Sequence, residues 1–284
     1  MQNKPLDIAI IGVGLIGGSA ALSLRGKAGI GRIVGVDQNE ANLAKAVKLG
    51  LVDAGVSLDE ALASCKVLIL SIPVDGILAM LPDLLDRVDD QVVIDMGSTK
   101  KLILDQVKDH PKRGRLVASH PMAGTEHSGP EAAFSGLFQD KVMVYTEANK
   151  SDEDAFEIAD YLTELLEMRT TFMNAEEHDA HTAYISHISH ITSMALALTV
   201  LEKEKSQGRI FELAGSGFES TVRLAKSSPE MWTPIFKQNR ENVLEVLKEH
   251  IRQLEAMHQA LEEENYGALH KLIRKSNKIK RILK

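Results

Sequence analysis

The chain has 284 residues with a formal net charge of −7, and 44% of its residues are hydrophobic and 26% charged. This is the composition of a globular protein of one large domain or two ordinary ones, and the negative charge disfavours general nucleic-acid binding, which needs a basic surface. One cysteine, Cys65, excludes an internal disulfide framework, and no run reaches the roughly 20 apolar residues of a membrane span or the pattern of a signal peptide. We therefore expect a cytoplasmic protein that contacts neither membrane nor nucleic acid.

In the first half of the chain, short β-branched runs alternate with helical patterns. Strands are expected at residues 6–14, 32–37, 67–74, 91–98, 114–121, 141–147 and 169–173. The runs at 67–74 and 91–98 are nearly all apolar, which is typical of parallel strands covered on both faces. Strands that alternate with helices predict right-handed βαβ units and a doubly wound, mainly parallel sheet of the α/β class.

After about Asn174 the strand patterns stop. One long helical pattern covers residues 176–205, and at least three more follow, around 208–226, 231–262 and 265–283. An α/β half followed by an all-α half predicts two domains, which we place at 1–173 and 174–284, with a cleft between them. The apolar faces of the long helices are wider than one chain can cover, so we expect a homodimer formed through the helical domain.

The segment GVGLIG places Gly12, Gly14 and Gly17 in the G-x-G-x-x-G spacing, directly after a predicted strand and at the start of a helix. In that context Gly12 permits a tight turn, Gly14 lets the backbone approach a pyrophosphate, and Gly17 allows close helix–strand packing. The helix N-terminus, with Leu15 and Ile16, offers free N–H groups and a positive dipole to the phosphates. Glycines that serve packing alone are the alternative, but the strand, the spacing and an acidic residue farther on together favour a Rossmann-type dinucleotide site.

That acidic residue is Asp37, which ends the second predicted strand, 20 residues after Gly17. A carboxylate at this place accepts hydrogen bonds from both ribose hydroxyls and repels a 2′-phosphate. The next residues, Gln38 and Asn39, supply no cation for such a phosphate. We therefore expect NAD as the cofactor, although Arg32 is near enough in sequence to leave the strictness of that preference open.

Ligands of open α/β sheets bind beyond the carboxyl ends of the strands. Ser71 and Pro73 follow one such strand, and Pro73 turns the chain over the expected nicotinamide. Ser98 and Lys100 follow the next strand, where a hydroxyl and a cation could meet a polar substrate. The alternatives are that Ser98 caps the helix that follows and that Lys100 is a solvated charge.

His120 lies at the end of the strand expected at 114–121, and Pro121 fixes the backbone after it. This placement suits a general acid or base beside the cofactor, although a single histidine is more often structural. His127, later in the same loop, has the pattern of an exposed residue.

Several segments together resemble the prephenate dehydrogenase family of tyrosine biosynthesis, which also includes arogenate dehydrogenases. They are GVGLIGGS, SIPV, DMGSTK, SHPMAGTEHSGPEAA and HISHITSMALAL, and the likeness covers residues 7–250. The glycine loop is common to many dehydrogenases, whereas the HPMAG and SHISH segments are specific. The resemblance implies NAD-dependent oxidative decarboxylation of prephenate to 4-hydroxyphenylpyruvate, with CO2 and NADH as the other products.

The resemblance also implies roles for individual residues. His120 takes the proton of the ring hydroxyl while hydride leaves the same carbon for the nicotinamide, and Ser98 hydrogen-bonds His120 or that hydroxyl. His190 faces the substrate from the helical domain, Arg223 binds a substrate carboxylate, and Trp232 lies near the same pocket. Because the chain ends with its helices, any inhibition by tyrosine is expected to act in the active-site cleft.

Elementary chemistry agrees with a role for Arg223. A dicarboxylate that enters a protein of net charge −7 needs a local cation, and the planar fork of arginine matches a carboxylate bidentately. Arg223 follows the AGSGFES turn, from which it can project into the cleft. Without the resemblance, a surface salt bridge is the simpler interpretation.

Two histidine pairs in the helical domain have a spacing that can bind zinc from one helix face. They are His178/His181 and His187/His190, each i, i+3. In a continuous helix the second pair points roughly opposite to the first, and no HExxH motif joins the second pair. We therefore expect no metal, and instead a helix lined with histidines beside an anionic substrate.

The sequence leaves alternatives open. The substrate could be arogenate, because no residue that reads the side chain separating it from prephenate is evident. A β-hydroxyacid or imine reductase would share the glycine loop and the helical domain without needing HPMAG, whereas a non-catalytic NAD sensor would not need His120, Ser98 and Arg223 together. The basic run from Lys271 onward could bind a membrane surface or nucleic acid, but its apolar helical stripe favours a terminal dimer helix.

Overall fold

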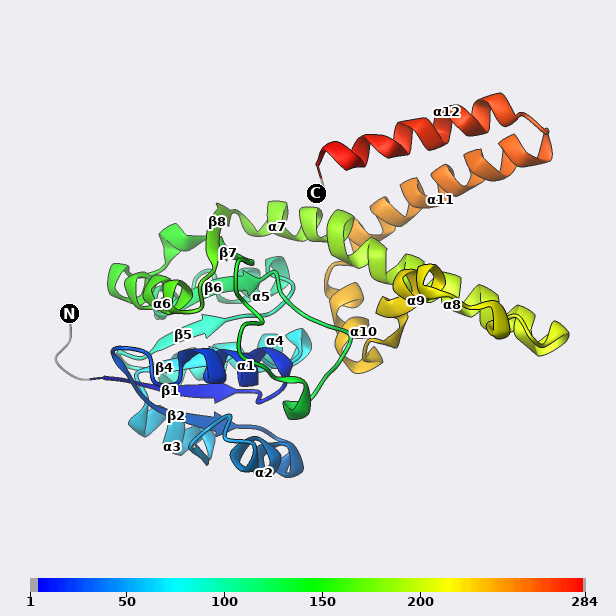
Figure 1. Ribbon diagram of the computed structural model, residues 1–284. Helices are drawn as coiled ribbons and strands as arrows, with labels where there is room; N and C mark the ends of the chain where they lie inside the picture. Colours follow the sequence, from blue (N-terminus) through cyan, green and yellow to red (C-terminus); the bar gives the residue numbers. More distant parts are fainter. Residues whose placement is uncertain (1–4, 283–284) are drawn as a thin grey trace.

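The computed structural model describes residues 5–282, apart from the side chains of residues 206 and 207, so the outermost ends of the two expected domains (1–4 and 283–284) lie outside the described residues. A twisted sheet with helices on both faces forms one part of the molecule, and helices alone form the other (Figure 1). The last strand ends at Met173, and the first helix of the helical part begins at Ala175. From there two helical arms extend away from the sheet (Figure 1).

The eight strands found in residues 5–282 form one sheet. They are β1 (Leu6–Ile11), β2 (Ile30–Val36), β3 (Ala54–Gly55), β4 (Val67–Leu70), β5 (Val92–Asp95), β6 (Leu116–Pro121), β7 (Val142–Thr146) and β8 (Arg169–Met173). Their order is β3-β2-β1-β4-β5-β6-β7-β8, and neighbours are parallel except β6 and β7. The chain winds outward from β1 in both directions, so the predicted doubly wound, mainly parallel sheet is confirmed.

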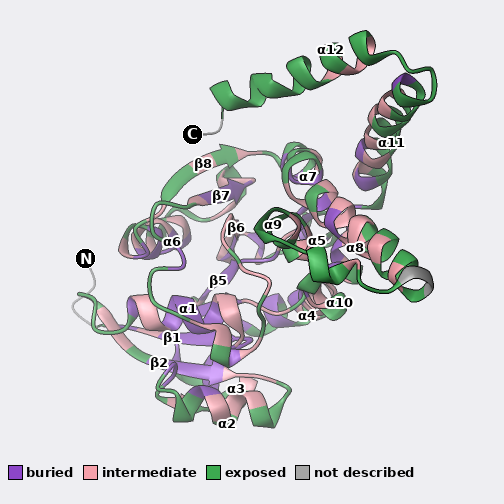
Figure 2. Cartoon of the chain, turned by 45° about the vertical axis from the view of Figure 1, so that its right-hand side comes forward, coloured by how far each residue is buried: buried purple, intermediate pink, exposed green. Residues whose placement is uncertain are grey.

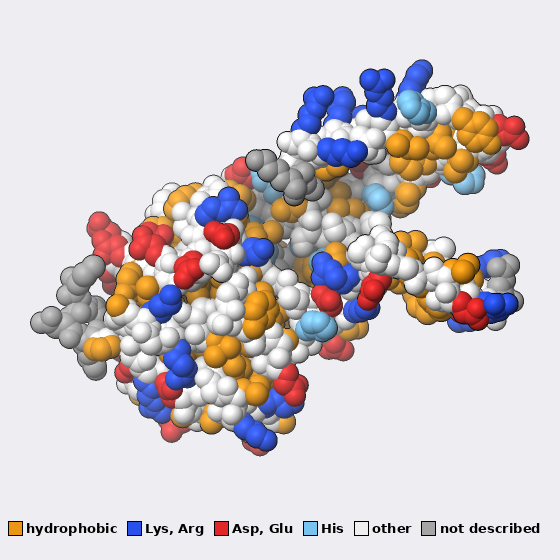
Figure 3. Space-filling view, viewed as in Figure 1, with side chains coloured by type: hydrophobic (Ala, Val, Ile, Leu, Met, Phe, Trp, Pro, Cys, Tyr) orange, Lys and Arg blue, Asp and Glu red, His pale blue; other side chains and the backbone are white. Residues whose placement is uncertain are grey.

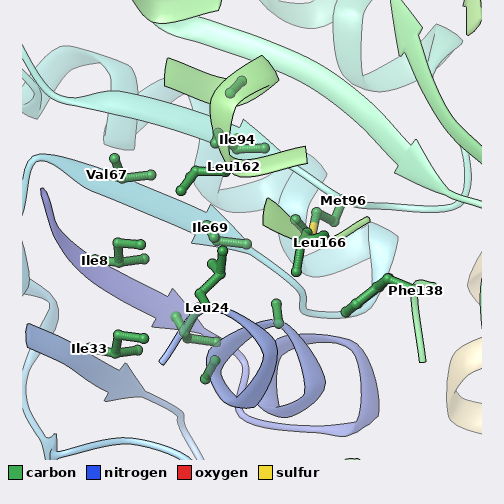
Figure 4. Close-up of a cluster of buried hydrophobic side chains, with 14 of the residues drawn as sticks. Ile8, Leu24, Ile33, Val67, Ile69, Ile94, Met96, Phe138, Leu162 and Leu166 are labelled. Atoms are coloured by element: carbon green, nitrogen blue, oxygen red, sulfur yellow. The ribbon is translucent and has the colours of Figure 1, made fainter. Parts of the chain in front are cut away.

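Six helices pack on the sheet. They are α1 (Leu15–Leu24), α2 (Glu40–Lys48), α3 (Leu58–Ser64), α4 (Val74–Arg87), α5 (Lys101–Val107) and α6 (Glu153–Leu165). One buried cluster, which includes Ile8, Leu24 and Leu162, fills the space between the strands and the helices α1 and α6 (Figure 4). A second cluster on the opposite face includes Leu68 and Ile77 and is covered by α3, α4 and α5. Because both faces are closed, the carboxyl ends of the parallel strands are left as the place for a ligand.

A loop of residues 122–141 joins β6 to β7 and contains only one short 3-10 turn, Pro130–Ala132. Without a crossover helix, β7 runs antiparallel to β6. The loop returns over α1, where the Phe134 N–H donates a hydrogen bond to Ser19 Oγ (3.1 Å). The segment that begins beside His120 therefore reaches the helix that begins at the glycine loop.

The helical part contains six further helices. They are α7 (Ala175–Thr182), α8 (Ile188–Gln207), α9 (Ser216–Val222), α10 (Pro229–Gln238), α11 (Arg240–Glu262) and α12 (Tyr266–Ser276). The long pattern predicted at 176–205 is α7 and α8 joined by a π-helical turn, Ala183–His187. The pattern predicted at 231–262 is α10 and α11, which meet at Asn239, and the region 208–226 holds only α9 and two 3-10 turns.

The helical part leaves much apolar surface exposed, in contrast to the buried strands (Figure 2). Leu198 of α8, Leu254 of α11 and Ile273 of α12 are all exposed. Hydrophobic side chains lie on both arms beside the open notch between them, whereas Lys and Arg follow the outer edge of α12 (Figure 3). By length and mean hydropathy the run Ala175–Lys205 also meets the criteria of a membrane span, which corrects the expectation that no segment does; only 11% of its most apolar window is buried within the chain.

Candidate active site

The glycine loop joins the end of β1 to the start of α1. Gly12 has a φ of +96°, a conformation that glycine adopts without strain. A Cβ on Gly17 would lie 2.1 Å from the Gly12 carbonyl oxygen and 2.3 Å from Ser71 Oγ, so this close packing requires glycine. A Cβ on Gly14 would meet nothing within 4 Å, which leaves the open approach to the backbone that a pyrophosphate needs.

Free backbone donors lie beside this open approach. Gly14 is the N-cap of α1 and brings no capping side chain, so the first N–H groups of the helix, at Leu15 and Ile16, have no intrahelical acceptor. Ser71, directly after β4, donates its hydroxyl to the Gly12 carbonyl oxygen (2.8 Å) and so ties the loop to the neighbouring strand. Pro73 follows as the N-cap residue of α4. The loop is thus a rigid helix N-terminus that can bind phosphate groups.

Asp37 directly follows β2, and its carboxylate accepts hydrogen bonds from the Val13 N–H (3.1 Å) and the Asn39 N–H (2.8 Å). The carboxylate therefore lies at the edge of the glycine loop, where the ribose of a dinucleotide is bound in this kind of fold. Arg32 precedes Asp37 by five strand positions, or roughly 16 Å at the rise of a β-strand. Its guanidinium interacts electrostatically with Asp53, so it does not serve the ribose position.

His120 lies at the carboxyl end of β6. Its Nδ1 is 2.8 Å from Nε2 of His178, and the two rings meet edge to face. Burial lowers the pKa of His120 well below its ordinary value, and the neighbouring His178, Lys100 and His187 lower it further. His120 is therefore neutral at pH 7 and able to accept a proton.

Asp179, in the middle of α7, forms the centre of a buried network. Its Oδ1 accepts hydrogen bonds from His178 Nδ1 (2.8 Å) and from the Lys100 N–H (2.9 Å), and its Oδ2 accepts one from the Lys101 N–H (2.9 Å). The carboxylate thus caps α5 from another element. The alternative in which Ser98 caps that helix is wrong. The N-cap residue of α5 is Lys100, two positions after Ser98, and its own side chain forms no capping hydrogen bond.

Ser98 itself is half-buried in the turn between β5 and α5. Among the described residues its hydroxyl makes no hydrogen bond, and the imidazole expected to receive it, that of His120, bonds to His178 instead. The Ser98 hydroxyl is therefore available to a ligand at the strand ends.

Lys100 is completely buried and forms an ion pair with Asp95, which is equally buried. Burial lowers the pKa of Lys100 from its ordinary value, and the charge of Asp95 opposes that change. The lysine is therefore not a solvated charge, and its ammonium group faces a buried carboxylate instead of solvent. The pair fixes the turn after β5 from within, beneath the candidate site.

On the helical side, the His190 ring stacks on Trp232 at a centroid separation of 3.5 Å. His187 Nδ1 lies 3.2 Å from Asn239 Nδ2, and the same amide nitrogen donates to the Asp179 carbonyl oxygen (2.6 Å). Burial lowers the pKa of His187 to about 4 and also lowers that of His190. These rings form one wall of neutral imidazoles around the buried indole.

The expectation that the pair His187/His190 points away from His178 is wrong for His187. A positive charge on His187 would repel one on His178 or on His120. In addition, Asn239 Nδ2 contacts both His187 Nδ1 and the backbone carbonyl oxygen of Asp179. The physical reason is the π-helical turn 183–187, since wider turns change the angular position of every residue after them. Within the described residues no group of three or more potential ligands could hold a metal ion.

Arg223, at the end of α9, donates to Glu126 Oε2 (2.6 Å) in the loop that follows His120. The arginine side chain is 47% exposed and that of Glu126 is 16% exposed. The structure thus brings Arg223 to the HPMAG loop, in an ion pair at the mouth of the site. His127 is exposed, as expected.

Sequence reasoning missed three members of this site. His178 was predicted only as one of a possible metal-binding pair, and no role was predicted for Asp179 or Glu126. The adjacent His178 and Asp179 at a helix beginning near the domain junction were the available signal. Nothing in the local pattern shows that they meet His120, which is 58 residues away from His178.

A dinucleotide-binding loop, a ribose-side carboxylate and a neutral histidine, all at the carboxyl ends of strands of one sheet, define a nicotinamide-dependent dehydrogenase. Comparison with known proteins makes the class more specific. Residues 20–171 match the model of the prephenate dehydrogenase nucleotide-binding domain, and residues 174–275 match that of the prephenate dehydrogenase dimerization domain. The chain therefore belongs to the prephenate dehydrogenase family.

Relatives along the whole chain agree. A prephenate dehydrogenase of Bacillus subtilis is 32% identical over 269 residues, which cover 93% of this chain and 72% of that protein. A cyclohexadienyl dehydrogenase of Zymomonas mobilis is 32% identical over 284 residues, covering 98% and 96%. The crystal structure of prephenate dehydrogenase from A. aeolicus in complex with hydroxyphenyl propionate and NAD+ superposes with a TM-score of 0.88 at 32% identity, over 99% of both chains.

Proposed function

We propose that this chain catalyses the NAD-dependent oxidative decarboxylation of prephenate to 4-hydroxyphenylpyruvate, CO2 and NADH. The observation that carries the proposal is His120, a neutral imidazole at the carboxyl end of β6, in the same parallel part of the sheet whose β1 ends in the dinucleotide loop. Its Nδ1 is bonded to His178, and its Nε2 has no hydrogen-bond partner among the described residues. A named prephenate dehydrogenase at 32% identity supports the same assignment.

NAD is the cofactor of the proposed reaction, and when bound it accepts the hydride. Gly12, Gly14 and Gly17 with the first N–H groups of α1 would hold the pyrophosphate, because Gly14 leaves the space open and nothing caps the helix. Asp37 would bind the ribose hydroxyls at the loop edge. Ser71, which hydrogen-bonds the same loop, and Pro73, at the start of α4, would line the nicotinamide side.

The chain's own chemistry in this reaction is the removal of one proton. As hydride leaves the ring carbon, the hydroxyl proton of that carbon passes to His120 Nε2, and Ser98 Oγ hydrogen-bonds the same hydroxyl. The low pKa of His120 keeps it in the accepting form at pH 7. Loss of CO2 then makes the ring aromatic, and the ring oxygen takes the proton back from His120 to give the phenol. This needs no metal and makes the overall step effectively irreversible.

The substrate's charge is assigned to the helical side of the cleft. Arg223 binds a carboxylate of prephenate, with Glu126 holding the guanidinium at the loop, because a dianion in a chain of net charge −7 needs a local cation. The stacked rings of His190 and Trp232 form a flat wall beside it, which suits a cyclohexadiene ring. Tyrosine carries a hydroxylated six-membered ring and a carboxylate on the side chain of that ring, as prephenate does, so we propose that it competes for the same cleft.

We also propose that two copies of the chain associate through the domain 174–284, after a nucleotide-binding domain of residues 1–173. The matching dimerization-domain model supports this, as does the exposed apolar surface of α8 and α11. A second copy accounts for the apolar character of Ala175–Lys205 without a membrane, since the helix also carries His178 and Asp179 in a buried polar network. A cytoplasmic location follows for a biosynthetic enzyme of this kind.

The test is NADH production by the purified protein with NAD and prephenate, and in parallel with arogenate. Turnover on prephenate is expected. Turnover on arogenate alone would keep the mechanism and change the substrate, a possibility that the name of the Zymomonas mobilis relative, cyclohexadienyl dehydrogenase, makes worth measuring. No turnover on either, with NAD still bound, would contradict the proposal and direct the search to a reductase. Addition of tyrosine to the same assay tests competition, which requires that KM for prephenate rises.

A further inference from the structure

A row of three side chains connects the proposed base to the helical part of the molecule. His120 on β6 meets His178 on α7 at 2.8 Å, and His178 meets Asp179 at 2.8 Å. His178 and Asp179 are both buried. The proposed proton transfer uses only Nε2 of His120, so it gives no role to the contact between His120 Nδ1 and His178.

The direction of each hydrogen bond follows from Asp179. Its carboxylate already accepts the backbone N–H groups of Lys100 and Lys101, both at 2.9 Å, so it acts as an acceptor. His178 Nδ1 must therefore carry the proton that Asp179 Oδ1 receives. In neutral His178 the remaining nitrogen, Nε2, then has a lone pair and can only accept.

The same logic fixes the proton on His120. Since His178 Nε2 accepts, His120 Nδ1–H is the donor of the 2.8 Å bond. Neutral His120 then has its lone pair on Nε2. This is the nitrogen that the proposed reaction needs as proton acceptor, whereas the opposite tautomer would turn an N–H toward the substrate hydroxyl.

We propose that His178 and Asp179 are positioning residues that hold His120 in the Nδ1–H tautomer and so leave Nε2 as the base. The proposal deepens the proposed function and rests on it, because only a proton-accepting His120 needs this tautomer. The arrangement works as the carboxylate does in a Ser-His-Asp triad, with one imidazole interposed.

Asp179 is held in place by the elements around it. The N-terminus of α5 supplies its two backbone donors, and Asn239 Nδ2 donates to its backbone carbonyl oxygen at 2.6 Å. A carboxylate at a helix N-terminus is also favoured by the helix dipole. The helical part thus determines which nitrogen of a sheet residue reacts.

The first test observes the tautomer directly, without substrate. In 15N-histidine-labelled protein with NAD bound, ring-nitrogen chemical shifts distinguish a protonated from an unprotonated nitrogen, and the His120→Asn spectrum assigns the signals. We expect His120 to carry its proton on Nδ1 at pH 7, and His178 likewise. A His120 with its proton on Nε2, or a His178 protonated on both nitrogens, would overturn the inference even if the enzyme oxidises prephenate. Failure of the enzyme to act on prephenate would leave this measurement unaffected.

The second test removes and restores the acceptor. His178→Leu leaves His120 Nδ1 without a partner, and we expect kcat to fall by about 10–100-fold, the range for residues that orient a catalytic group, with NAD affinity unchanged. His178→Gln offers an amide oxygen near the position of Nε2 and should recover roughly tenfold of the loss, as expected for one restored hydrogen bond.

The matched controls are His181→Leu and His181→Gln, on the exposed side of the same helix. Both should keep the activity of the unmodified protein. Equal kcat in His178→Leu and the unmodified protein would contradict the inference, as would equal losses in the Leu and Gln variants at position 178. If His178→Leu does not fold, the Gln variant and the spectrum of the unmodified protein still decide the matter.

Discussion

The sheet part of the chain buries its own hydrophobic residues, whereas the helical part leaves many of its large apolar side chains exposed. Ile8 and Leu68 are completely buried on opposite faces of the sheet, while Leu198 and Leu254 on the helical arms face outward. Burial of one large aliphatic side chain contributes about 1.5–3 kcal/mol, so the helical arms hold substantial unused stabilisation. The comparison teaches that the dinucleotide loop lies in a part that covers its own core, whereas the helical part, which holds the proposed substrate residues Arg223 and Trp232, keeps apolar surface open that the proposed second copy would cover.

The two parts nevertheless meet at the proposed base, His120. The backbone of His120 belongs to β6, but the partner of its Nδ1 belongs to α7. A change at His120 should therefore have the largest effect of any single substitution, because it removes what both parts cooperate to position.

His120→Asn should lower kcat by about 10³–10⁴-fold, since it removes both the proton acceptor and its orientation. NAD affinity should stay the same, because the glycine loop does not contact this side chain. Steady-state kinetics with prephenate and fluorescence titration with NADH measure the two quantities. His127→Asn, an exposed histidine of the same loop, is the control and should behave as the unmodified protein. A His120→Asn variant with near-normal kcat would falsify the assignment of the base.

Arg223 tests the contribution of the helical part alone. Arg223→Ala should raise KM for prephenate by about 30–100-fold, the loss expected when a charge-assisted bidentate bond of 2–3 kcal/mol is removed, with a smaller fall in kcat. The effect falls on KM because the carboxylate contact exists in the ground state and the transition state alike.

Lys226→Ala, an exposed cation of the same segment, is the matched control for Arg223→Ala and should leave KM unchanged. Unchanged KM in the arginine variant would return Arg223 to a plain surface salt bridge with Glu126. A fall in kcat alone would also contradict ground-state binding of the carboxylate.

Much of this comparison could be predicted from the sequence, because it depends on local patterns. The strand–glycine–helix order of residues 6–24 and the acidic Asp37 each lie within one βαβ unit, where spacing determines geometry. The doubly wound sheet followed from alternation of strands and helices. The resemblance to the family assigned Arg223 to a substrate carboxylate, which stays a prediction; its ion pair with Glu126 was not predicted.

What could not be predicted depends on contacts between distant segments. The cap of α5 comes from Asp179, which lies 79 residues after Lys100. The residues next to the helix suggested Ser98 as the cap instead. The burial of Lys100 depends on Asp95, and no periodicity shows that the turn folds inward. The π-helical turn at 183–187 rotates His187 toward His178, whereas a helical wheel assumes a constant period.

Leu198→Glu tests whether the open face of the helical part is an interface between two copies. A charge placed in a buried apolar contact costs about 2 kcal/mol, so the dimer dissociation constant should rise about 30-fold. Sedimentation velocity over a range of concentrations measures it. Leu49→Glu, an equally simple change of an exposed leucine on the sheet part, should leave the dimer intact. Identical dissociation constants for the two variants would show that this face of α8 is not the interface.

The smallest expected effect is that of acid pH on kcat/KM. Measuring it tests whether the contact between the two parts keeps His120 neutral. Burial, His178, Lys100 and His187 lower the pKa of His120 well below 6.5. Because the proposed reaction needs the neutral ring, kcat/KM should keep its full value at a pH above this lowered pKa. It should fall as the pH drops through that pKa. From pH 7 to pH 5.5, kcat/KM should therefore fall by much less than the roughly tenfold that a histidine of ordinary pKa would lose.

Folding must be measured over the same range of pH. A histidine whose pKa is lowered by folding destabilises the folded state as the pH falls below its unfolded value, since the unfolded chain then binds the extra proton. Circular dichroism at each pH separates this loss of structure from titration of the base. A tenfold fall in kcat/KM by pH 5.5 with unchanged structure would mean that the free enzyme exposes His120 to solvent, and hence that the helical part does not close over the sheet before substrate binds.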